Sequence, residues 1–300
     1  MCLSQLRLVT RGRVRPTVRL LPQSRNFSSV VQGAKYTPSF RQYVLMSNGE
    51  IGSYFHDVPL SLDENAATLN MVVEIPRWTN AKFEISKDIL FNPIVQDSKN
   101  GKLRYVDNIF PFRGYMHNYG AIPQTWEDPT REEFAGTGLK GDNDPLDCCE
   151  IGSRIIPTGT VKSVRLLGSL GLIDDGELDW KVIVISTEDP LAERIFNLGD
   201  VEKYMPGLLT STREWFRNYK IPQGKPANSF TFNEEYKDVS ETLDVVKRCH
   251  ESWRRLIDRK GFENTSKLPL TERSGYGIFL TDKSKPDGKL PSDLEKWHYL

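Results

Sequence analysis

The middle of this sequence alternates short strand-like segments with residues that form turns, and this pattern restricts the fold strongly. Residues 98–145 hold four prolines and six glycines, which leave no room for a long helix. Runs of alternating or continuous apolar residues predict strands at 71–75, 82–85, 147–152, 160–168 and 179–186. Regular alternation of strands with helices of about 10–15 residues, typical of parallel sheets, is absent.

Helical patterning is concentrated late in the chain. The strongest pattern runs from about Val239 to Arg259, where apolar side chains recur on one helical face. Shorter helices are predicted at 201–204 and 210–217, and the polar, proline-containing stretch 262–300 predicts an irregular tail on the surface. Short strands followed by one long helix favour a mainly β or α+β fold, in the form of a small barrel with flanking helices.

The N-terminal segment differs from the rest of the chain in charge. Its 49 residues before Glu50 contain eight basic groups and no carboxylate, interleaved with leucine, valine, serine and threonine. This composition is typical of a mitochondrial presequence. The stretch Arg25-Asn-Phe-Ser-Ser29 resembles a processing site, so we expect a presequence at 1–27 and a mature domain at 28–261, with an N-terminal extension to about residue 50. The alternative is a disordered basic arm that binds nucleic acid or anionic lipid.

The remaining chain is acidic. From position 50 onward it holds 32 basic and 40 acidic residues, a net charge of −8. We therefore expect no nucleic-acid binding by this part of the chain. No stretch approaches the roughly 18 apolar residues of a transmembrane helix. The four cysteines, two of them adjacent, form no disulfide framework, which favours a reducing compartment.

The densest cluster of reactive side chains is Gly141-Asp-Asn-Asp-Pro-Leu-Asp147. Three carboxylates within six residues repel one another unless a cation compensates them, and hard divalent cations such as Mg²⁺ prefer oxygen ligands. Pro145 interrupts any strand there and would let Asp142, Asp144 and Asp147 face one cavity. The alternative is an exposed acidic turn, because Asp, Asn, Gly and Pro are common turn residues.

The sequence does not fit an EF-hand calcium site, a zinc site or a dinucleotide-binding motif. An EF-hand loop that began at Asp142 would have Asp147 instead of glycine at its sixth position and Ser153 instead of glutamate at its twelfth. The four histidines are scattered, without the paired spacing of zinc ligands. Residues 136–141 match a dinucleotide-binding fingerprint, but no strand precedes them and no helix can follow.

A second acidic cluster lies around Asp175-Gly176, which predicts a hairpin turn between Asp174 and Asp179. Strand alternation would place Asp179 and Lys181 on one face, and the same carboxylate–amine pairing recurs at Lys82 and Glu84. Such pairs suit a metal–phosphate complex, although solvated salt-bridging faces would look the same. Further candidate phosphate ligands are Arg104, Tyr115, Tyr119, Tyr219 and Lys220.

Six motifs follow one another in order within residues 42–260. They are Val73-Glu-Ile-Pro-Arg-Trp-Thr-Asn-Ala-Lys-Phe-Glu84, His117-Asn-Tyr-Gly120, Pro123-Gln-Thr-Trp-Glu-Asp128, Asp142-Asn-Asp-Pro-Leu-Asp147-Cys148, Asp200-Val-Glu-Lys-Tyr204 and Trp215-Phe-Arg-Asn-Tyr-Lys-Ile-Pro222. Together they resemble the soluble family I inorganic pyrophosphatases of the eukaryotic type. With the presequence, the resemblance extends to the mitochondrial members of that family.

The resemblance implies an OB-like five-stranded β-barrel with helices outside, and Mg²⁺-dependent hydrolysis of diphosphate to two phosphates. Several Mg²⁺ ions would bind, and Mn²⁺ or other divalent ions could substitute. The implied ligands of the principal metal are Asp142, Asp147 and Asp179, with Asp147 bridging to a second metal, and those of the substrate-borne metals are Glu84, Asp174 and Asp179. The implied base is Asp144, the implied proton donor is Tyr115, and the implied phosphate ligands are Lys82, Arg104, Tyr119, Lys181, Tyr219 and Lys220.

Three other functions remain open on the sequence alone: a nucleotide or polyphosphate hydrolase, an OB-type module for single-stranded nucleic acid, and an inactive interaction protein. The resemblance also implies a homodimer. Aromatic residues such as Trp78 would suit a dimer interface equally well as a core. We expect a location in the mitochondrial matrix, either free or associated peripherally with the inner membrane.

Overall fold

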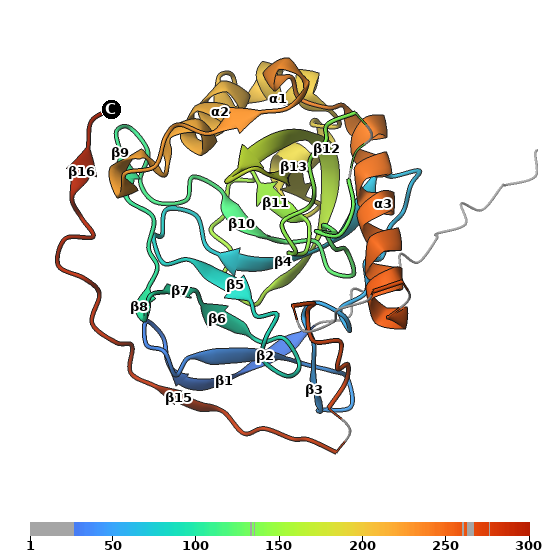
Figure 1. Ribbon diagram of the computed structural model, residues 1–300, viewed down its shortest axis with the longest axis vertical. Coiled ribbons are helices and arrows are strands. Elements are labelled where there is room, and N and C mark those ends of the chain that lie inside the picture. Colours follow the sequence, from blue (N-terminus) through green and yellow to red (C-terminus); the bar gives the residue numbers. More distant parts are fainter. Residues whose placement is uncertain (1–26, 133, 135, 260, 263–266, 276) are drawn as a thin grey trace, which may run out of the picture.

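The computed structural model describes residues 27–132, 134, 136–259, 261–262, 267–275 and 277–300, so all but the last residue of the expected presequence at 1–27 lies outside the described residues. Five strands close into a ring (Figure 1). In pairing order the ring strands are β12 (Val161–Asp174), β13 (Glu177–Ser186), β11 (Asp147–Glu150), β10 (Asn118–Ala121) and β4 (Thr68–Ile75), which pairs back with β12. All neighbours are antiparallel except β11 and β13. The predicted mainly β architecture is confirmed.

A second sheet lies beside the ring and pairs the N-terminal strand of the described chain with a strand of the C-terminal tail (Figure 1). Its strands pair in the order β15 (Lys283–Lys285), β1 (Ser28–Ala34), β2 (Arg41–Leu45), β6 (Ile94–Gln96) and β5 (Phe83–Ile85), and β3 (Ile51–Gly52) pairs with β2. Residues 28–50, expected as an extension, are therefore an integral part of a sheet.

The expected irregular tail is largely extended and exposed, but it contains two short strands. One is β15, which runs parallel to β1. The other is β16 (Trp297–His298), which pairs with β9 (Asn108–Ile109). The tail thus follows the surface of the molecule and is fixed to it at two strands (Figure 1).

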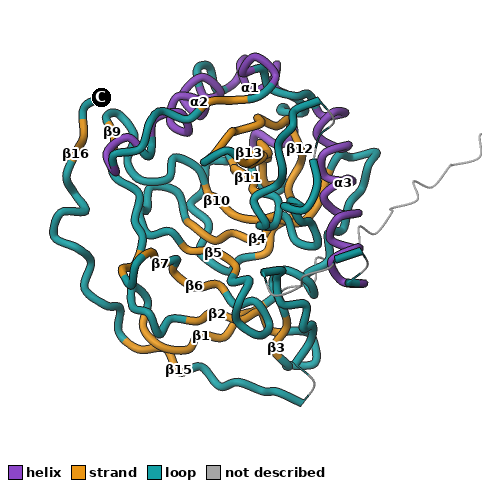
Figure 2. The backbone as a smooth tube through the Cα atoms, viewed as in Figure 1, coloured by secondary structure: helices purple, strands orange, loops and turns teal. Residues whose placement is uncertain are grey.

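In the described part of the chain, three α-helices cover other sides of the ring (Figure 2). They are α1 (Leu198–Tyr204), α2 (Leu208–Asn218) and α3 (Val239–Asp258), and the remaining short elements are β7 (Ser98–Lys99), β8 (Lys102–Leu103), β14 (Ser229–Phe230) and 3-10 turns at Pro190–Glu193, Ile221–Gln223 and Phe232–Glu234. The long helix predicted near 239–259 is confirmed. A capping box begins it, in which Asp238 and Glu241 satisfy each other's backbone N–H groups. Within the described residues, no helix has the length and apolar character needed to cross a membrane.

The β12–β13 hairpin turns at Asp175-Gly176, where both residues have positive φ. Along β13, Trp180, Val182 and Val184 pack in a core cluster shared with α3. On the opposite face, Ile183 and Ile185 pack in a cluster shared with α2 and the second sheet. Asp179 and Lys181 share the face of Ile183 by strand alternation, as the sequence predicts. We call this the site-bearing face of β13.

Candidate active site

All thirteen candidate residues from the sequence line one cavity of about 220 Å³. They come from the ring, from β5 and the residue before it, from the position after β8 (Lys102–Leu103), from the loops before β10 and β11, and from the segment directly after α2 (Leu208–Asn218). The lining contains nine carboxylates and four basic side chains. Such an excess of closely spaced negative charge calls for further cations. The lining candidates are Lys82, Glu84, Arg104, Tyr115, Tyr119, Asp142, Asp144, Asp147, Asp174, Asp179, Lys181, Tyr219 and Lys220.

The acidic loop is held in shape by main-chain contacts with Glu127 and Asp128. Glu127 N donates to Asp144 O at 2.9 Å, and Asn143 N donates to Glu127 O at 3.0 Å. Gly141 lies so close to this segment that an added Cβ would be 2.3 Å from the carbonyl carbon of Glu127. Pro145 then separates the loop from β11. All three loop carboxylates consequently line the same cavity, as the sequence predicts.

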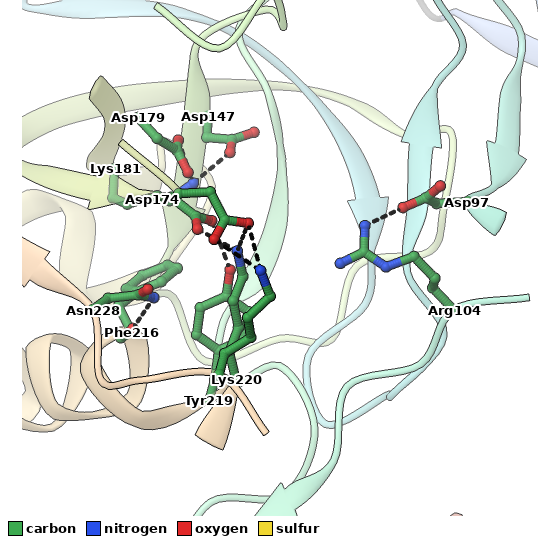
Figure 3. Close-up of polar contacts among 12 residues, drawn as sticks. Asp97, Arg104, Asp147, Asp174, Asp179, Lys181, Phe216, Tyr219, Lys220 and Asn228 are labelled. Carbon is green, nitrogen blue, oxygen red and sulfur yellow. Dashed lines mark hydrogen bonds and ion pairs between the residues drawn. The ribbon is translucent and has the colours of Figure 1, made fainter. Parts of the chain in front are cut away.

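Lys181 is the centre of a polar network on the ring strands (Figure 3). Its Nζ lies 2.5 Å from Asp179 Oδ1, 2.6 Å from Asp147 Oδ2 and 2.8 Å from the Tyr119 hydroxyl. The hydroxyl of Tyr119 in turn donates to Asp147. The parallel register of β11 and β13, which pairs Asp147 with Lys181, creates this arrangement.

Burial and charge shift the pKa values of these groups. Burial disfavours the ammonium form of Lys181, but the negative charges of Asp147 and Asp179 outweigh the effect of burial, so the pKa of Lys181 is raised. Burial raises the pKa of Asp179 to about 7, although Lys181 opposes this shift. Burial, followed by the charges of Asp144 and Asp179, raises the pKa of Asp142. These carboxylates are therefore poorly compensated by the protein's own cations.

A second network joins the end of α2 to the β12–β13 hairpin (Figure 3). Tyr219 and Lys220 directly follow the helix, and Asp174 is the last residue of β12. The Tyr219 hydroxyl donates to Asp174 Oδ2 at 3.2 Å, and Lys220 Nζ donates to Asp174 Oδ1. Burial, then the charge of Asp174, raises the pKa of Tyr219. The α2 end and the hairpin tip therefore form one wall of the cavity.

The opposite wall carries Lys82, Glu84 and Arg104. Lys82 donates to Glu84, and its Nζ lies 3.3 Å from Asp97 Oδ2. Arg104 Nη1 donates to the same Asp97 oxygen at 2.5 Å, and Figure 3 shows its guanidinium turned toward Tyr219 and Lys220. Burial opposes the carboxylate of Asp97, but Lys82 and Arg104 outweigh it and lower its pKa. Asp97 therefore orients two basic side chains, a function that no sequence signal revealed.

Tyr115 lies deep in the cavity. Its ring centroid is 5.1 Å from that of Tyr119 and 5.2 Å from that of Trp215. Burial is the main cause that raises its pKa above the ordinary value of a phenol. Tyr115 is therefore a weak acid that keeps its proton at neutral pH.

Besides Asp97, three further charged residues at the site were missed by sequence reasoning. Glu74 lines the cavity and accepts a bond from Ile85 N at 2.7 Å. A carboxylate within an otherwise apolar strand is a sequence signal that could have marked Glu74 as a site residue. Lys87 pairs with Asp144 at 2.7 Å, and Glu127 accepts from Trp180 N at 3.0 Å. Neither of these two has a distinctive sequence context.

Oxygens of Glu127, Asp142 and Asp179 all lie within 4.8 Å of one another. The second carboxylate oxygen of Glu127 is buried without a hydrogen-bond partner among the described residues. A set of buried carboxylate oxygens is the donor type that hard divalent cations prefer. The residues of this site fit a bound divalent metal ion.

Comparison with known proteins identifies relatives of this chain. The sequence model of the inorganic pyrophosphatase family matches residues 71–254. The mitochondrial inorganic pyrophosphatase of Saccharomyces cerevisiae is 56% identical over 293 residues, which cover 96% of this chain and 94% of the yeast protein. The chain belongs to the inorganic pyrophosphatase family.

Solved inorganic pyrophosphatases share the fold. The structure from Schistosoma japonicum is 44% identical with a TM-score of 0.84, covering 91% of this chain and 100% of that one. A truncated vacuolar soluble pyrophosphatase of Trypanosoma cruzi in complex with PPi is 40% identical with a TM-score of 0.71, covering 85% and 100%. The predicted family is therefore confirmed.

As an inorganic pyrophosphatase, the chain is an enzyme that hydrolyses diphosphate. Dependence on divalent metal ions is a property of the family, and the carboxylate cluster can hold such an ion. The protein is mitochondrial, in agreement with the yeast relative and with the basic, acid-free N-terminal segment.

Proposed function

We propose that the cavity hydrolyses the Mg²⁺ complex of diphosphate and that each of the thirteen residues has a defined role there. Asp142, Asp147 and Asp179 would hold the principal metal, with Asp147 shared with a second. Glu84 and Asp174 would hold metals that arrive with the substrate. The single observation that carries this proposal is the convergence of all thirteen residues on one cavity in which carboxylates outnumber basic groups by nine to four.

The metal ions would compete with the lysines for the same carboxylate oxygens. Lys181 contacts Asp147 and Asp179, and Lys220 contacts Asp174. Divalent ions on these carboxylates would free the ammonium groups for phosphate oxygens. Bound Mg²⁺, or Mn²⁺ in its place, lowers the pKa of a coordinated water and neutralises phosphoryl charge.

The protein's own residues then bind the polyanion and handle the protons. Diphosphate oxygens would contact a set of basic groups and phenols on both walls, namely Lys82, Arg104, Tyr119, Lys181, Tyr219 and Lys220. Asp144 would accept the proton of the attacking water, because it lies on the acidic loop beside the metal ligands. Tyr115 would donate a proton to the leaving phosphate, although its raised pKa makes it a weak proton donor.

Phosphate release tests this proposal directly. A chain that begins at Ser28 is assayed with diphosphate and Mg²⁺, then after addition of EDTA, with ATP as a second substrate. We expect fast release of phosphate from diphosphate and not from ATP. EDTA should abolish this release, and added Mg²⁺ should restore it, with Mn²⁺ restoring it more weakly. Release that persists in EDTA would contradict the metal-dependent mechanism, and equal hydrolysis of ATP would contradict the substrate assignment.

We also propose a homodimer located in the matrix, free or peripherally bound to the inner membrane. Trp78 and Phe110 are 54% and 63% exposed, and large exposed aromatic side chains are common at protein interfaces. Sedimentation of the wild type and of Trp78→Ala tests the dimer, because loss of an interface aromatic shifts the protein toward monomer. Carbonate extraction of mitochondrial membranes tests peripheral attachment, and mass spectrometry of the mature protein tests cleavage near Phe27.

A further inference from the structure

A short piece of the C-terminal tail contacts two loops that border the active site. Lys267 O accepts from Asn143 Nδ2 at 3.0 Å, and Leu270 N donates to Lys87 O at 2.9 Å. Leu268, between them, is buried in the core cluster shared with α2 and the second sheet. In Figure 1 this red segment lies beside the lower end of α3, close to β3. We call residues 267–270 the C-terminal clamp.

The C-terminal clamp is anchored to the body of the protein. Leu270 O accepts from His56 Nε2 at 2.8 Å and from Asn92 Nδ2 at 3.2 Å. Trp253 of α3 donates to His56 Nδ1 at 2.9 Å, which leaves the proton of the imidazole on Nε2 for Leu270. Arg259 at the end of α3 donates to Pro269 O at 3.1 Å. The main chain of the clamp is thus held by the side chains of His56, Asn92 and Arg259, in addition to that of Asn143.

The two loops that the clamp contacts meet at one ion pair. Asn143 lies between Asp142 and Asp144 in the left-handed region, with φ of 71°. Lys87, on the loop after β5, places its Nζ 2.7 Å from Asp144 Oδ1. The clamp therefore bonds the loop that carries Asp144 and, separately, the loop that carries its partner.

The bond to the clamp is specific to the side chain of Asn143. Its Oδ1 accepts from Trp126 Nε1 at 3.1 Å while its Nδ2 donates to Lys267 O, so both ends of the amide are used. An amide that is fixed at both ends in a left-handed residue leaves the acidic loop little freedom. Displacements of about 1 Å at a catalytic group can cost about 100-fold in rate.

We propose that the C-terminal clamp, acting through Asn143 and Lys87, positions the Asp144 carboxylate for its reaction with water. Asn143 is thereby a positioning residue for diphosphate hydrolysis, and the tail contributes to catalysis without contacting the substrate. The inference rests on the proposed role of Asp144 as the base.

A double-mutant cycle separates positioning from a general structural effect. Asn143→Gly keeps the left-handed backbone but removes both side-chain bonds. We expect kcat to fall about tenfold with the KM for diphosphate within about twofold of wild type. In the Asp144→Asn background, Asn143→Gly should cause no further loss of kcat, because the group it positions is gone. Glu272→Ala, an exposed change just beyond the clamp, serves as the control with unchanged kinetics.

The outcomes distinguish this inference from the function on which it rests. Full kcat in Asn143→Gly, or equal fold losses in the wild-type and Asp144→Asn backgrounds, would overturn the clamp while leaving the proposed base intact. Full kcat in Asp144→Asn would overturn the base itself. If Asn143→Gly does not fold, Leu270→Pro removes the donor to Lys87 O and carries the same test from the other loop, with the same expected losses.

Discussion

The two ends of the site-bearing face of β13 are built on opposite principles. Asp179 and Lys181 are buried at one end, and Ile183 and Ile185 are buried at the other. Burial of the isoleucines stabilises the fold by roughly 25 cal/mol per Å² of apolar surface. Burial of the carboxylate costs free energy and raises its pKa to about 7. One strand thus combines a half that stabilises the fold with a half that the fold must hold in place for chemistry.

The largest expected effect is on rate, at Asp144 of the acidic loop, which lines the same cavity as the charged end of β13. Asp144→Asn should lower kcat about a thousandfold, because a positioned general base contributes about 10²–10⁴. The free energy of unfolding should change by less than about 1 kcal/mol, since the Lys87 pair is partly exposed. Steady-state kinetics and urea denaturation of the same preparation measure both. A variant with normal kcat would remove Asp144 from the mechanism.

The reverse pattern is expected at the apolar end. Ile183→Ala should lower the free energy of unfolding by about 3 kcal/mol, because it leaves a cavity in a fully buried cluster. The kcat of the folded fraction should stay within about threefold of wild type. Val95→Ala, at a half-buried position in the second sheet, is the matched control, with a smaller loss. A kcat that falls as far as in Asp144→Asn would show that the two ends are not separable.

Acid sharpens the comparison, because one of the buried groups on which it acts, His56, does not line the cavity. Burial lowers the pKa of His56 to about 4, below the ordinary 6.5. The unfolded chain therefore takes up this proton first as the pH falls. The contribution is fully present above pH 6.5 and is lost between pH 6.5 and 4, by about 3 kcal/mol in all.

Urea unfolding of wild type and His56→Gln at pH 7 and pH 5 measures this contribution. The wild type should lose more stability than the variant on acidification. Equal losses in the two proteins would mean that His56 is not the titrating group.

The smallest expected effect is stabilisation by metal. Ions that bind only the folded site should raise the free energy of unfolding by about 2.7 kcal/mol at 100 times their dissociation constant. Asp179→Asn should weaken this response, because it removes a ligand, whereas Ile183→Ala should keep it. Thermal unfolding across a Mg²⁺ titration measures the shift. A full response in Asp179→Asn would place the stabilising ion elsewhere.

Local patterns predicted the parts of the fold whose stability is local. The helix predicted at 239–259 and the hairpin predicted at Asp175-Gly176 are confirmed. Both could be predicted because their capping and turn signals lie within a few residues of the element itself. The strands of residues 28–52 and the pairing of β1 with β15 were missed. Their register depends on partners up to about 250 residues away, and short edge strands carry little periodic signal.

The site was predicted for a related reason. Carboxylates clustered at Asp142–Asp147, or paired with lysine on one strand face, are visible in sequence because they are adjacent. Lys87 contacts Asp144 on the acidic loop, which is distant in sequence, so only the fold brings the two together. Asp97 contacts Arg104 across the short β7–β8 hairpin, where no sequence motif marked it. The roles of the thirteen residues stay predictions until a metal or substrate is seen among them.

The most direct test is the position of Mn²⁺ in crystals of the chain from Ser28, located by anomalous scattering. We predict strong peaks between Asp142, Asp147 and Asp179, with Lys181 displaced from at least one of its carboxylate partners. The same crystals of Asp179→Asn should show the principal peak weakened. Peaks away from these three carboxylates in the wild type would contradict the assignment of the charged end of β13 to metal binding.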